Sequence, residues 1–318
     1  MSCQNADFDW QYKTVPQSDS HYASVNQQSN WPRGKVLGGC SSINGMLYVR
    51  CNKTDYDQWS SQYGCTGWSY SDMLPYFIKL ERAHHSIPKS SYRNHSEQGM
   101  MDVTRLEYFS PLTSLFIESC INNGIQYNDD YNGETMNGVS LSQVTIQNGK
   151  RWSVASGYLL PAIKRENLHI LIHAHVCRVT FDKSKNATGV IIITEKNKEE
   201  QYIRIKPDIG EVILSAGTVG SPHILLLSGI GPKEQLEKFN ISVTVDLPGV
   251  GKNLQDHMMT PMYYLCRIPT LSRADLTEAN LTQWSTEGRG ILSDCGLEAL
   301  AWLRMNSGLE SSKCHSNH

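Results

Sequence analysis

The sequence contains 318 residues, of which 39% are hydrophobic and 19% are charged, and its formal net charge is −2 at pH 7. A chain of this length can bury a sizeable core, and its near-neutral charge excludes the basic surface typical of proteins that bind nucleic acid or anionic membranes. No apolar run approaches the roughly 20 residues that a membrane-spanning helix needs. We therefore predict a globular chain of one large domain or two smaller ones, with no nucleic-acid partner and no membrane span. The composition does not determine an oligomeric state.

The nine cysteines are scattered along the chain without a CxxC pair, so they predict no structural zinc site. We expect most of these thiols to be free and buried, as thiols in intracellular proteins often are. The polar, acidic N-terminal stretch MSCQNADFDWQYKT predicts no secretory signal. Five N-x-S/T sequons indicate secretion instead, so the compartment stays open; they begin at Asn52, Asn94, Asn186, Asn240 and Asn280.

Residues 31–47, WPRGKVLGGCSSINGML, follow a polar lead-in and combine glycines with small polar side chains. Glycine permits a positive φ and a close approach by another group because it has no Cβ. One interpretation is that Gly38 and Gly39 bring backbone N–H groups, and a short helix starting at 41–42, toward a large polar ligand. An ordinary surface turn with incidental cations fits the same residues, so composition leaves both interpretations open.

Two helices are predicted in the following 80 or so residues. Apolar residues recur at helical spacing in 70–83, after Ser71 and Asp72, and predict the first helix. The second is predicted over 111–122, with Gly124 as its stop. The polar segment 84–101 between them predicts a loop.

The pattern changes from helix to strand after Leu168. Segments 168–182, 190–194 and 202–205 are strand-like and lie at short intervals, with NATG as one of the turns, so they predict a three-stranded meander. The apolar stretch EVILSAG, residues 211–217, predicts a further strand after the meander.

A glycine turn and a helix are predicted directly after the strand at 211–217. Ser221 is a candidate N-cap with Pro222 at the first helical position, and Gly229 is expected to end the helix. A strand, a glycine turn and a helix N-terminus in this order form the α/β crossover edge where nucleotide cofactors commonly bind. Any βα unit has the same pattern, so a plain scaffold is the alternative.

A metal site is the most specific alternative function for the predicted strand at 168–182. His169, His173, His175 and Cys177 alternate along one predicted strand, which would let their side chains face the same side. A metal site would also need a partner that orients the ligands, and no carboxylate is spaced among them. Ordinary surface or packed side chains are the simpler interpretation, and we predict no metal site.

Other catalytic motifs are absent from the sequence. It contains neither the G-x-S-x-G nucleophile elbow of hydrolases nor a P-loop. Asp256 and His257 are adjacent, so their side chains point in different directions on most backbones. We predict a hydrogen-bonded turn there and not a catalytic dyad.

The two glycine-rich stretches together resemble the signatures of the glucose-methanol-choline (GMC) family of flavin-dependent alcohol oxidoreductases. Residues 217–231 fit the second signature throughout, and 34–44 followed by Tyr48 fit the first signature apart from two positions. The resemblance covers nearly the whole chain and is nearest to the insect glucose dehydrogenase and choline dehydrogenase branch. Further similarity runs through DFDWQYKTVPQ, DYDQW, LPYF, SGYLLPAIKRENLHILIHAHVCRV, LPGVGKNLQDH and GRGILSDCGLEALAW.

The resemblance implies a mixed α/β (α+β) fold, in which a partial FAD-binding Rossmann-like domain accompanies a substrate domain built on an antiparallel sheet. It implies oxidation of the CH–OH group of a small-molecule alcohol, with hydride passing to FAD. The residues implied to contact FAD are Val36, Gly39, Cys40, Asn44, Gly45, Met46 and Leu47, together with Val176 at the adenine end.

Three positions depart from the family pattern. Cys40 stands where a small hydroxyl residue or glycine is usual, and Cys51 stands where glycine is usual, so Cys51 is expected to strain a turn that favours a positive φ. Ile43 occupies the place of a histidine that some choline-oxidising relatives bond to FAD. The resemblance therefore implies a non-covalent flavin.

The sequence contains neither the family's N-terminal G-x-G-x-x-G loop nor its C-terminal catalytic histidine motif. The histidines after His257 are His315 and His318, in a polar tail, so the resemblance implies no catalytic residue here. We interpret the chain as the middle part of a GMC protein; the alternative is a catalytically inactive relative with a binding or regulatory role. The implied domains are an FAD-binding domain in two parts, 1–64 and 151–258, and a substrate domain in two parts, 65–150 and 259–318.

Overall fold

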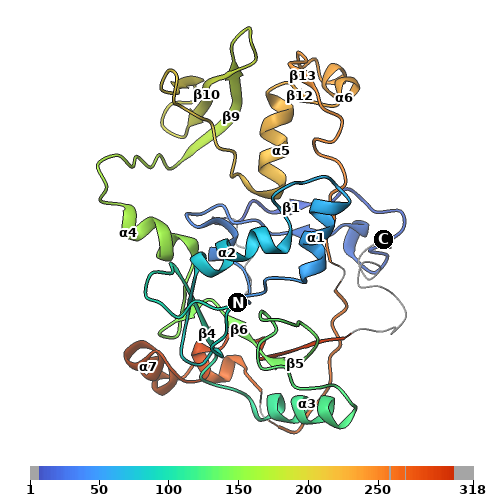
Figure 1. Ribbon diagram of the computed structural model, residues 1–318, viewed down its shortest axis with the longest axis vertical. Helices are drawn as coiled ribbons and strands as arrows, with labels where there is room; N and C mark the ends of the chain where they lie inside the picture. Colours follow the sequence, from blue (N-terminus) through green and yellow to red (C-terminus); the bar gives the residue numbers. More distant parts are fainter. Residues whose placement is uncertain (1–6, 258, 269, 304–318) are drawn as a thin grey trace. The chain divides into compact units, whose positions relative to one another are not determined.

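The computed structural model describes residues 7–257, 259–268 and 270–303 (Figure 1). The chain forms two compact units, of which the first combines Met1–Arg165 with Leu265–His318 and the second is Glu166–Tyr264. Both units combine helices with small β-sheets, so the predicted mixed α/β class is confirmed. The four-part domain assignment is a finer statement and stays a prediction. Within the described residues, no helix has the length and apolar character needed to cross a membrane.

The first unit contains most of the secondary structure. Its helices are η1 (Val25–Gln27), η2 (Gly39–Ser42), α1 (Lys53–Ser61), α2 (Tyr70–Leu80), α3 (Pro111–Asn122), η3 (Ala155–Leu159), α4 (Leu160–Ala162), η4 (Arg273–Asp275), α7 (Glu278–Glu287) and η5 (Ile291–Ser293). Its strands are β1 (Tyr12–Lys13), β2 (Asn30–Trp31), β3 (Glu81–Ala83), β4 (Met101–Arg105), β5 (Gly138–Leu141), β6 (Gln143–Val144), β7 (Ile146–Gln147), β8 (Lys150–Arg151) and β14 (Ala299–Trp302).

The helices α1 and α2 begin at side chains that satisfy their first N–H groups. Asn52 with Asp55 forms a capping box at α1, and Ser69 with Asp72 forms another at α2. The two helices pack together around the ring of Tyr56, which meets aromatic rings from both of them. Burial in this cluster raises the pKa of the Tyr56 hydroxyl to about 12.

The helix predicted over 70–83 is confirmed, but it ends at Leu80. The next residues, Glu81–Ala83, form β3 and pair in parallel with β4. The Glu81 side chain is fully buried and forms ion pairs with two arginine side chains. The backbone leaves the helical conformation at this residue, and the carboxylate lies in the interior of the unit. The second predicted helix coincides with α3, and Ser110 is its N-cap.

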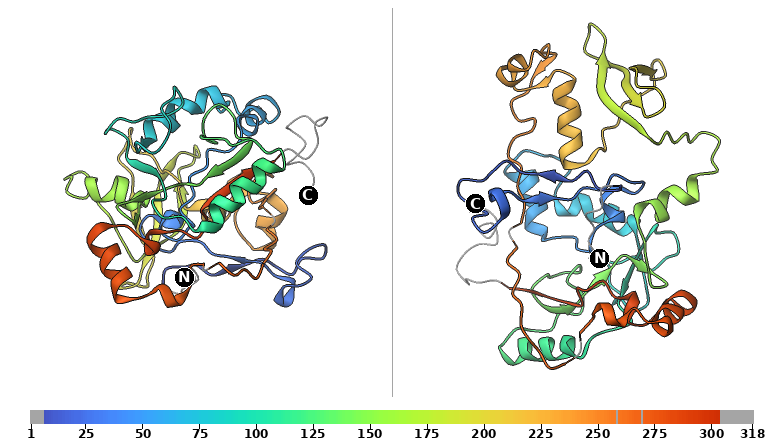
Figure 2. Two further views of the ribbon diagram at one scale, coloured as in Figure 1. Left: turned by 90° about the horizontal axis from the view of Figure 1, so that it is seen from below. Right: turned by 180° about the vertical axis from the view of Figure 1, so that it is seen from behind.

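Small sheets surround the core of the first unit. The strands β3, β4 and β6 form one sheet, β5 pairs antiparallel with β14, and β7 pairs antiparallel with β8. The helix α3 packs against β5 and β14, and both views in Figure 2 show it beside them. Two clusters of buried side chains fill the interior: Ala83, Ile87 and Val103 in one, and Leu106, Val144 and Ile146 in the other.

The second unit contains β9 (Ala174–Phe181), β10 (Ala187–Thr194), β11 (Gln201–Arg204), α5 (Gly217–Leu227), β12 (Ile230–Gly231), α6 (Lys233–Lys238) and β13 (Val245–Asp246). The first three strands form an antiparallel sheet in the order β11-β10-β9, which confirms the predicted meander. β9 begins at Ala174, later than the predicted start at Leu168. The first hairpin turn spans 182–186, so most of the NATG stretch belongs to β10.

The strand predicted at 211–217 is wrong. Residues 211–215 have no assigned secondary structure, and Ile213 is 80% exposed. A strand exists through its hydrogen-bonded neighbours, and no described residue pairs with this stretch. The apolar composition of 211–217 therefore predicted a strand, but the described chain contains no neighbouring strand that pairs with it.

The helix α5 begins at Gly217, earlier than the N-cap predicted at Ser221. Ser221 lies inside the helix, where its Oγ accepts a hydrogen bond from the backbone N–H of Ala216 at 3.0 Å. Pro222 lies inside the helix beyond its first turn, and without an N–H it leaves the Thr218 carbonyl without the usual intrahelical donor. Gly229 follows the helix with φ of +79°, which confirms the predicted stop.

The described cysteines are free, as expected, but most of them are not buried. Cys120 is the buried one among them; Cys40, Cys51, Cys65 and Cys266 are exposed. The expectation of buried thiols rested on a general tendency of cysteine, and local loop positions override that tendency here.

We predict that Ser228→Ala lowers the free energy of unfolding of the second unit by about 1 to 3 kcal/mol. The Ser228 Oγ accepts a hydrogen bond from the buried backbone N–H of Val179 in β9 at 2.8 Å, so the alanine leaves that donor without a partner. Urea denaturation of the chain measures the change. The exposed Ser184→Ala is the matched control, and equal effects from both variants would contradict the prediction.

Candidate functional site

Apart from Val176, the residues predicted to contact a cofactor lie in one segment, residues 36–47, which we call the cofactor-facing segment. Gly38 has φ of +86° and Gly39 has φ of +53°, so both adopt the left-handed region that the sequence predicted for them. The short 3-10 helix η2 follows at Gly39–Ser42. A Cβ on Gly34 would collide with the Gly39 carbonyl, so a third glycine is needed where the chain folds back on itself.

The outer face of the cofactor-facing segment is open. Val36 is 43% exposed, and Cys40, Asn44 and Gly45 are exposed as well. A Cβ built on Gly39 would meet no described atom within 4 Å, so a ligand can approach the backbone there. An accessible backbone flanked by an apolar side chain and an amide suits a large ligand that is partly aromatic and partly polar, such as a flavin.

The inner face of the segment is packed and hydrogen-bonded. Met46 and Leu47 contact the buried cluster of Leu106, Val144 and Ile146. The backbone N–H of Thr145 donates to the Met46 carbonyl at 2.8 Å, and Leu47 forms a β-bridge with Val144. The side chains of Met46 and Leu47 are therefore partly buried against the core, and this packing fixes the backbone that they belong to.

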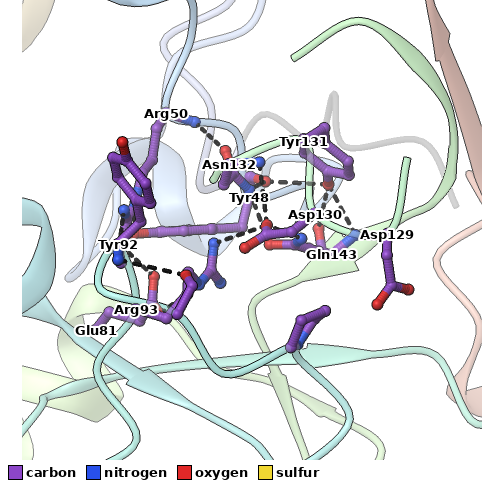
Figure 3. A network of polar contacts seen from close by, with 12 residues as sticks. Tyr48, Arg50, Glu81, Tyr92, Arg93, Asp129, Asp130, Tyr131, Asn132 and Gln143 are labelled. Atoms are coloured by element: carbon purple, nitrogen blue, oxygen red, sulfur yellow. Dashed lines mark hydrogen bonds and ion pairs between the residues drawn. The ribbon is translucent and has the colours of Figure 1, made fainter. Parts of the chain in front are cut away.

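The C-terminal end of the segment runs into a buried polar network (Figure 3). The Tyr48 N–H donates to the Gln143 carbonyl at 2.8 Å, and its own carbonyl accepts from Asn132 Nδ2 at 2.9 Å. The Arg50 N–H donates to Asn132 Oδ1 at 2.6 Å. Burial raises the pKa of the Tyr48 hydroxyl, and that of the neighbouring Tyr131, because a low-dielectric interior disfavours the ionised form.

Four charged side chains form the centre of this network. Glu81 binds Arg50 at 2.6 Å and Arg93 at 2.8 Å, and Arg93 lies 3.3 Å from Asp130. The side chain of Glu81 has no exposed surface, and those of both arginines have almost none. Charges buried this completely are tolerated because each faces an opposite charge, although Glu81 Oε1 and the Nε and Nη2 atoms of Arg93 make no aligned hydrogen bond.

This buried network was missed at the sequence level, although one signal was available. Glu81 lies on the apolar stripe of the predicted helix, in line with Leu74, Phe77 and Ile78. A carboxylate on such a stripe indicates a buried polar group that needs a partner. Its partners come from distant segments, so the sequence does not identify them.

Three further positions were singled out in the sequence: Cys51, Ile43 and Val176. Cys51 has φ of +68°, which confirms the positive φ and the strain expected from its place in the family pattern. Ile43 closes the helix η2 and is half-buried. Val176 is partly exposed in β9, an outer strand of the sheet in the second unit. Its contact with the adenine end of a cofactor stays a prediction.

The histidine-rich stretch is not a single alternating strand, because His169 and His173 precede β9. His173 Nδ1 lies 3.1 Å from a carboxylate oxygen of Glu195, a partner that the spacing did not predict. No group of three or more His, Cys, Asp or Glu side chains in the described part of the chain is arranged to hold a metal ion.

The adjacent pair at Asp256 and His257 forms a local hydrogen bond. The Asp256 carboxylate accepts from the backbone N–H of His257 at 2.9 Å, but residues 252–257 have no assigned turn, so the predicted turn is not found at this pair. The predicted absence of a catalytic role for His315 and His318 concerns positions outside the described residues.

A second polar cluster lies in a groove of about 490 Å³ beside the N-terminus of α3. Glu298 accepts hydrogen bonds from the backbone N–H of Ser110 at 2.7 Å and from the Thr113 hydroxyl, so it caps the helix. Burial raises the pKa of the neighbouring Asp294, and the nearby Glu298 charge adds to this shift. Glu298 therefore holds the start of α3, and these bonds leave it engaged with protein.

Comparison with known proteins adds to this geometry. A family model described as GMC oxidoreductase matches residues 12–259. The chain is 39% identical over 254 residues to a glucose dehydrogenase (FAD, quinone) of Drosophila melanogaster, a match that covers 80% of this chain and 40% of that protein. It is 38% identical over 307 residues to an oxygen-dependent choline dehydrogenase of Brucella anthropi, a match that covers 95% of this chain and 53% of that protein.

Solved structures are similar over the same range. An FAD-dependent oxidoreductase from Chaetomium thermophilum matches with a TM-score of 0.78 and 26% identity, over 92% of this chain and 52% of that one. A pyridoxine 4-oxidase from Mesorbium loti matches with a TM-score of 0.65 and 27% identity, over 76% of this chain and 45% of that one. The chain spans about half the length of the relatives that it matches.

We predict that Glu81→Ala lowers the free energy of unfolding of the first unit by about 3 to 5 kcal/mol, because it leaves two buried arginines without their carboxylate. The matched control is Glu97→Ala, since Glu97 is 93% exposed and lies 3.8 Å from Arg82. That control should change the stability by less than about 1 kcal/mol. Urea unfolding of both variants checks the difference, and a loss below about 1 kcal/mol for Glu81→Ala would refute it.

We predict that Asp294→Asn changes how stability depends on pH. The pKa of Asp294 is raised in the folded state, so the folded chain binds this proton more readily than the unfolded chain. The contribution of this group to the free energy of unfolding therefore increases as the pH falls through its raised pKa in the folded state. The increase ends once the same carboxyl is also protonated in the unfolded chain. Thermal unfolding of the wild type should show this gain between pH 7 and pH 4, and the asparagine variant should show a smaller one. An equal pH dependence in both proteins would contradict the assignment.

Proposed function

The chain belongs to the GMC oxidoreductase family, and from this premise we propose that it forms part of an FAD-dependent enzyme that oxidises the CH–OH group of a small alcohol to an aldehyde or ketone. The family match over 12–259 carries the proposal, because it includes both the cofactor-facing segment and α5. Two of the similar proteins named above, the glucose dehydrogenase (FAD, quinone) and the FAD-dependent oxidoreductase, carry FAD in their names.

FAD fits the open face of the cofactor-facing segment. The residues that would hold it are Val36, Gly39, Cys40, Asn44 and Gly45, which are accessible at least in part. The backbone of Met46 and Leu47 completes the proposed set in the first unit, and a contact of Val176 with the adenine end stays a prediction. When bound, FAD supplies the hydride acceptor for the alcohol carbon. The protein segment supplies a fixed backbone surface against which the ring is oriented.

No residue of this chain is assigned the role of the general base. Among the described histidines, His257 donates its backbone N–H to the Asp256 carboxylate, and His173 pairs with Glu195 on the surface. A positioned base contributes typically about 10² to 10⁴ in rate. We therefore propose that the 318 residues contribute cofactor binding and orientation, and that the 318-residue chain alone does not oxidise alcohols at an appreciable rate.

We predict that the 318-residue chain binds FAD with a dissociation constant of about micromolar or weaker, because its sequence has no G-x-G-x-x-G loop to bind the pyrophosphate. Val36→Asp should weaken this binding about tenfold or more, since a carboxylate on the open face repels the anionic cofactor. Titration with FAD, followed by flavin fluorescence, measures both constants.

The matched control for this titration is Val25→Asp, which places the same charge at a position that is 85% exposed in the same unit. It should leave FAD affinity unchanged. Equal weakening by both variants would contradict the proposed position of the cofactor. A wild-type chain that binds no FAD would instead favour the alternative function, a binding or regulatory relative.

We predict that bound FAD is released when the protein is denatured, because Ile43 offers no nucleophilic atom for a covalent bond to the flavin. Acid precipitation of the loaded chain should leave the yellow cofactor in the supernatant. Flavin that stays in the pellet, attached to a peptide containing residue 43, would refute non-covalent binding.

A further inference from the structure

Arg151 connects the end of the β7–β8 hairpin to the cofactor-facing segment. Its Nη1 atom donates to Asn44 Oδ1 at 2.8 Å and to the Ser41 carbonyl at 3.1 Å. Three residues further on, the backbone N–H of Val154 donates to the Ser41 hydroxyl at 3.0 Å. One guanidinium thus holds the chain on both sides of Ile43.

The hydrogen bonds also fix which way the Asn44 side chain points. Its Oδ1 accepts from Arg151 and from the Met46 N–H at 3.0 Å, so both protein donors meet the oxygen. An amide with its oxygen used twice must turn its NH₂ group the other way. Asn44 is exposed, and no residue in the described ranges accepts a hydrogen bond from its Nδ2.

We propose that Arg151 is a positioning residue for the cofactor: it orients Asn44 so that the Nδ2 of Asn44 donates a hydrogen bond to an acceptor atom of the flavin. This inference rests on the proposed function, because it concerns the same segment. Arg151 acts through Asn44 and is not required to touch the cofactor. A charged donor is suited to this task, because hydrogen bonds from a guanidinium are stronger than those between neutral groups.

The hairpin that carries Arg151 is itself well placed for the role. Arg151 pairs with Ile146 in the β-ladder, and Ile146 belongs to the buried cluster against which Met46 and Leu47 pack. The next residue, Trp152, donates its backbone N–H to the Thr145 carbonyl at 2.9 Å. The guanidinium therefore extends from a backbone that is already fixed to the inner face of the segment.

The first test uses the chain without FAD. Hydrogen exchange read by mass spectrometry should show peptides covering 40–46 exchanging about tenfold faster in Arg151→Met, because the segment loses two hydrogen bonds. Arg151→Lys should restore part of the protection. The control Arg165→Met removes an exposed cation from the same unit and should leave these peptides unchanged. Unchanged exchange in Arg151→Met would overturn the inference.

The second test separates the donor from the loop geometry. Asn44→Asp keeps two acceptor oxygens for Arg151 and Met46 but replaces the NH₂ donor by a negative charge. It should therefore keep wild-type exchange and weaken FAD binding more than Val36→Asp does, which adds the charge without removing a donor. Arg151→Met should weaken FAD binding about fivefold to tenfold. The double variant Arg151→Met with Asn44→Ala should bind FAD no more weakly than Asn44→Ala alone, as expected when one residue acts through the other.

These outcomes distinguish the inference from the proposed function. An Asn44→Asp variant that binds FAD no more weakly than Val36→Asp, or fully additive losses in the double variant, would overturn the role of Arg151 while the function stands. A wild-type chain without FAD affinity would overturn the proposed function and the cofactor part of the inference together. Faster exchange in Arg151→Met, with FAD affinity lower in Asn44→Asp than in Val36→Asp, would support the inference.

Discussion

The buried ion network of Arg50, Glu81, Arg93 and Asp130 is the constraint on which the rest of the first unit depends (Figure 3). It joins the end of the cofactor-facing segment, the strand β3 and two loops that are far apart in the sequence. Each ion pair is buried, so separating either partner would leave a charge without water or counter-charge. The network therefore permits one arrangement of these segments and penalises the alternatives.

The network fixes the inner face of the cofactor-facing segment and leaves its outer face accessible. Behind the segment, Arg50 bonds through its backbone to Asn132, and Thr145 bonds to Met46. In front, no described atom lies within contact distance of a Cβ placed on Gly39. A surface that is rigid before its ligand arrives loses less conformational entropy on binding, so binding costs less free energy. The buried charges stabilise the site indirectly, by holding the chain that faces the ligand.

The sequence predicted those helices and strands whose ends are determined by residues nearby in the chain. The helix α3 was predicted with the correct bounds because its apolar residues recur at helical spacing and Gly124 marks its end within the chain itself. The meander was predicted because its strands follow one another with short turns. The positive φ values at Gly38 and Gly39 followed from glycine's freedom, and that at Cys51 from the family pattern.

The failures have a common physical cause, which is dependence on distant partners. Residues 211–215 have strand-like composition, but pairing decides whether a strand forms, and no described segment pairs with them. The helix α2 ends at Leu80 because Glu81 meets Arg50 and Arg93 in the folded chain. The orientation of Asn44 likewise depends on Arg151, which lies more than a hundred residues away. Periodicity and spacing contain no information on such contacts.

The central claim is that residues 36–47 form a preorganised surface for FAD. Hydrogen exchange of the wild-type chain, compared with and without saturating FAD, tests it most directly. We predict slow exchange at Tyr48 and Arg50 in both states, and FAD-dependent protection concentrated in peptides covering 36–47. Protection elsewhere with none in this segment, or exchange at 48–50 as fast as in an unfolded chain before FAD is added, would contradict the claim.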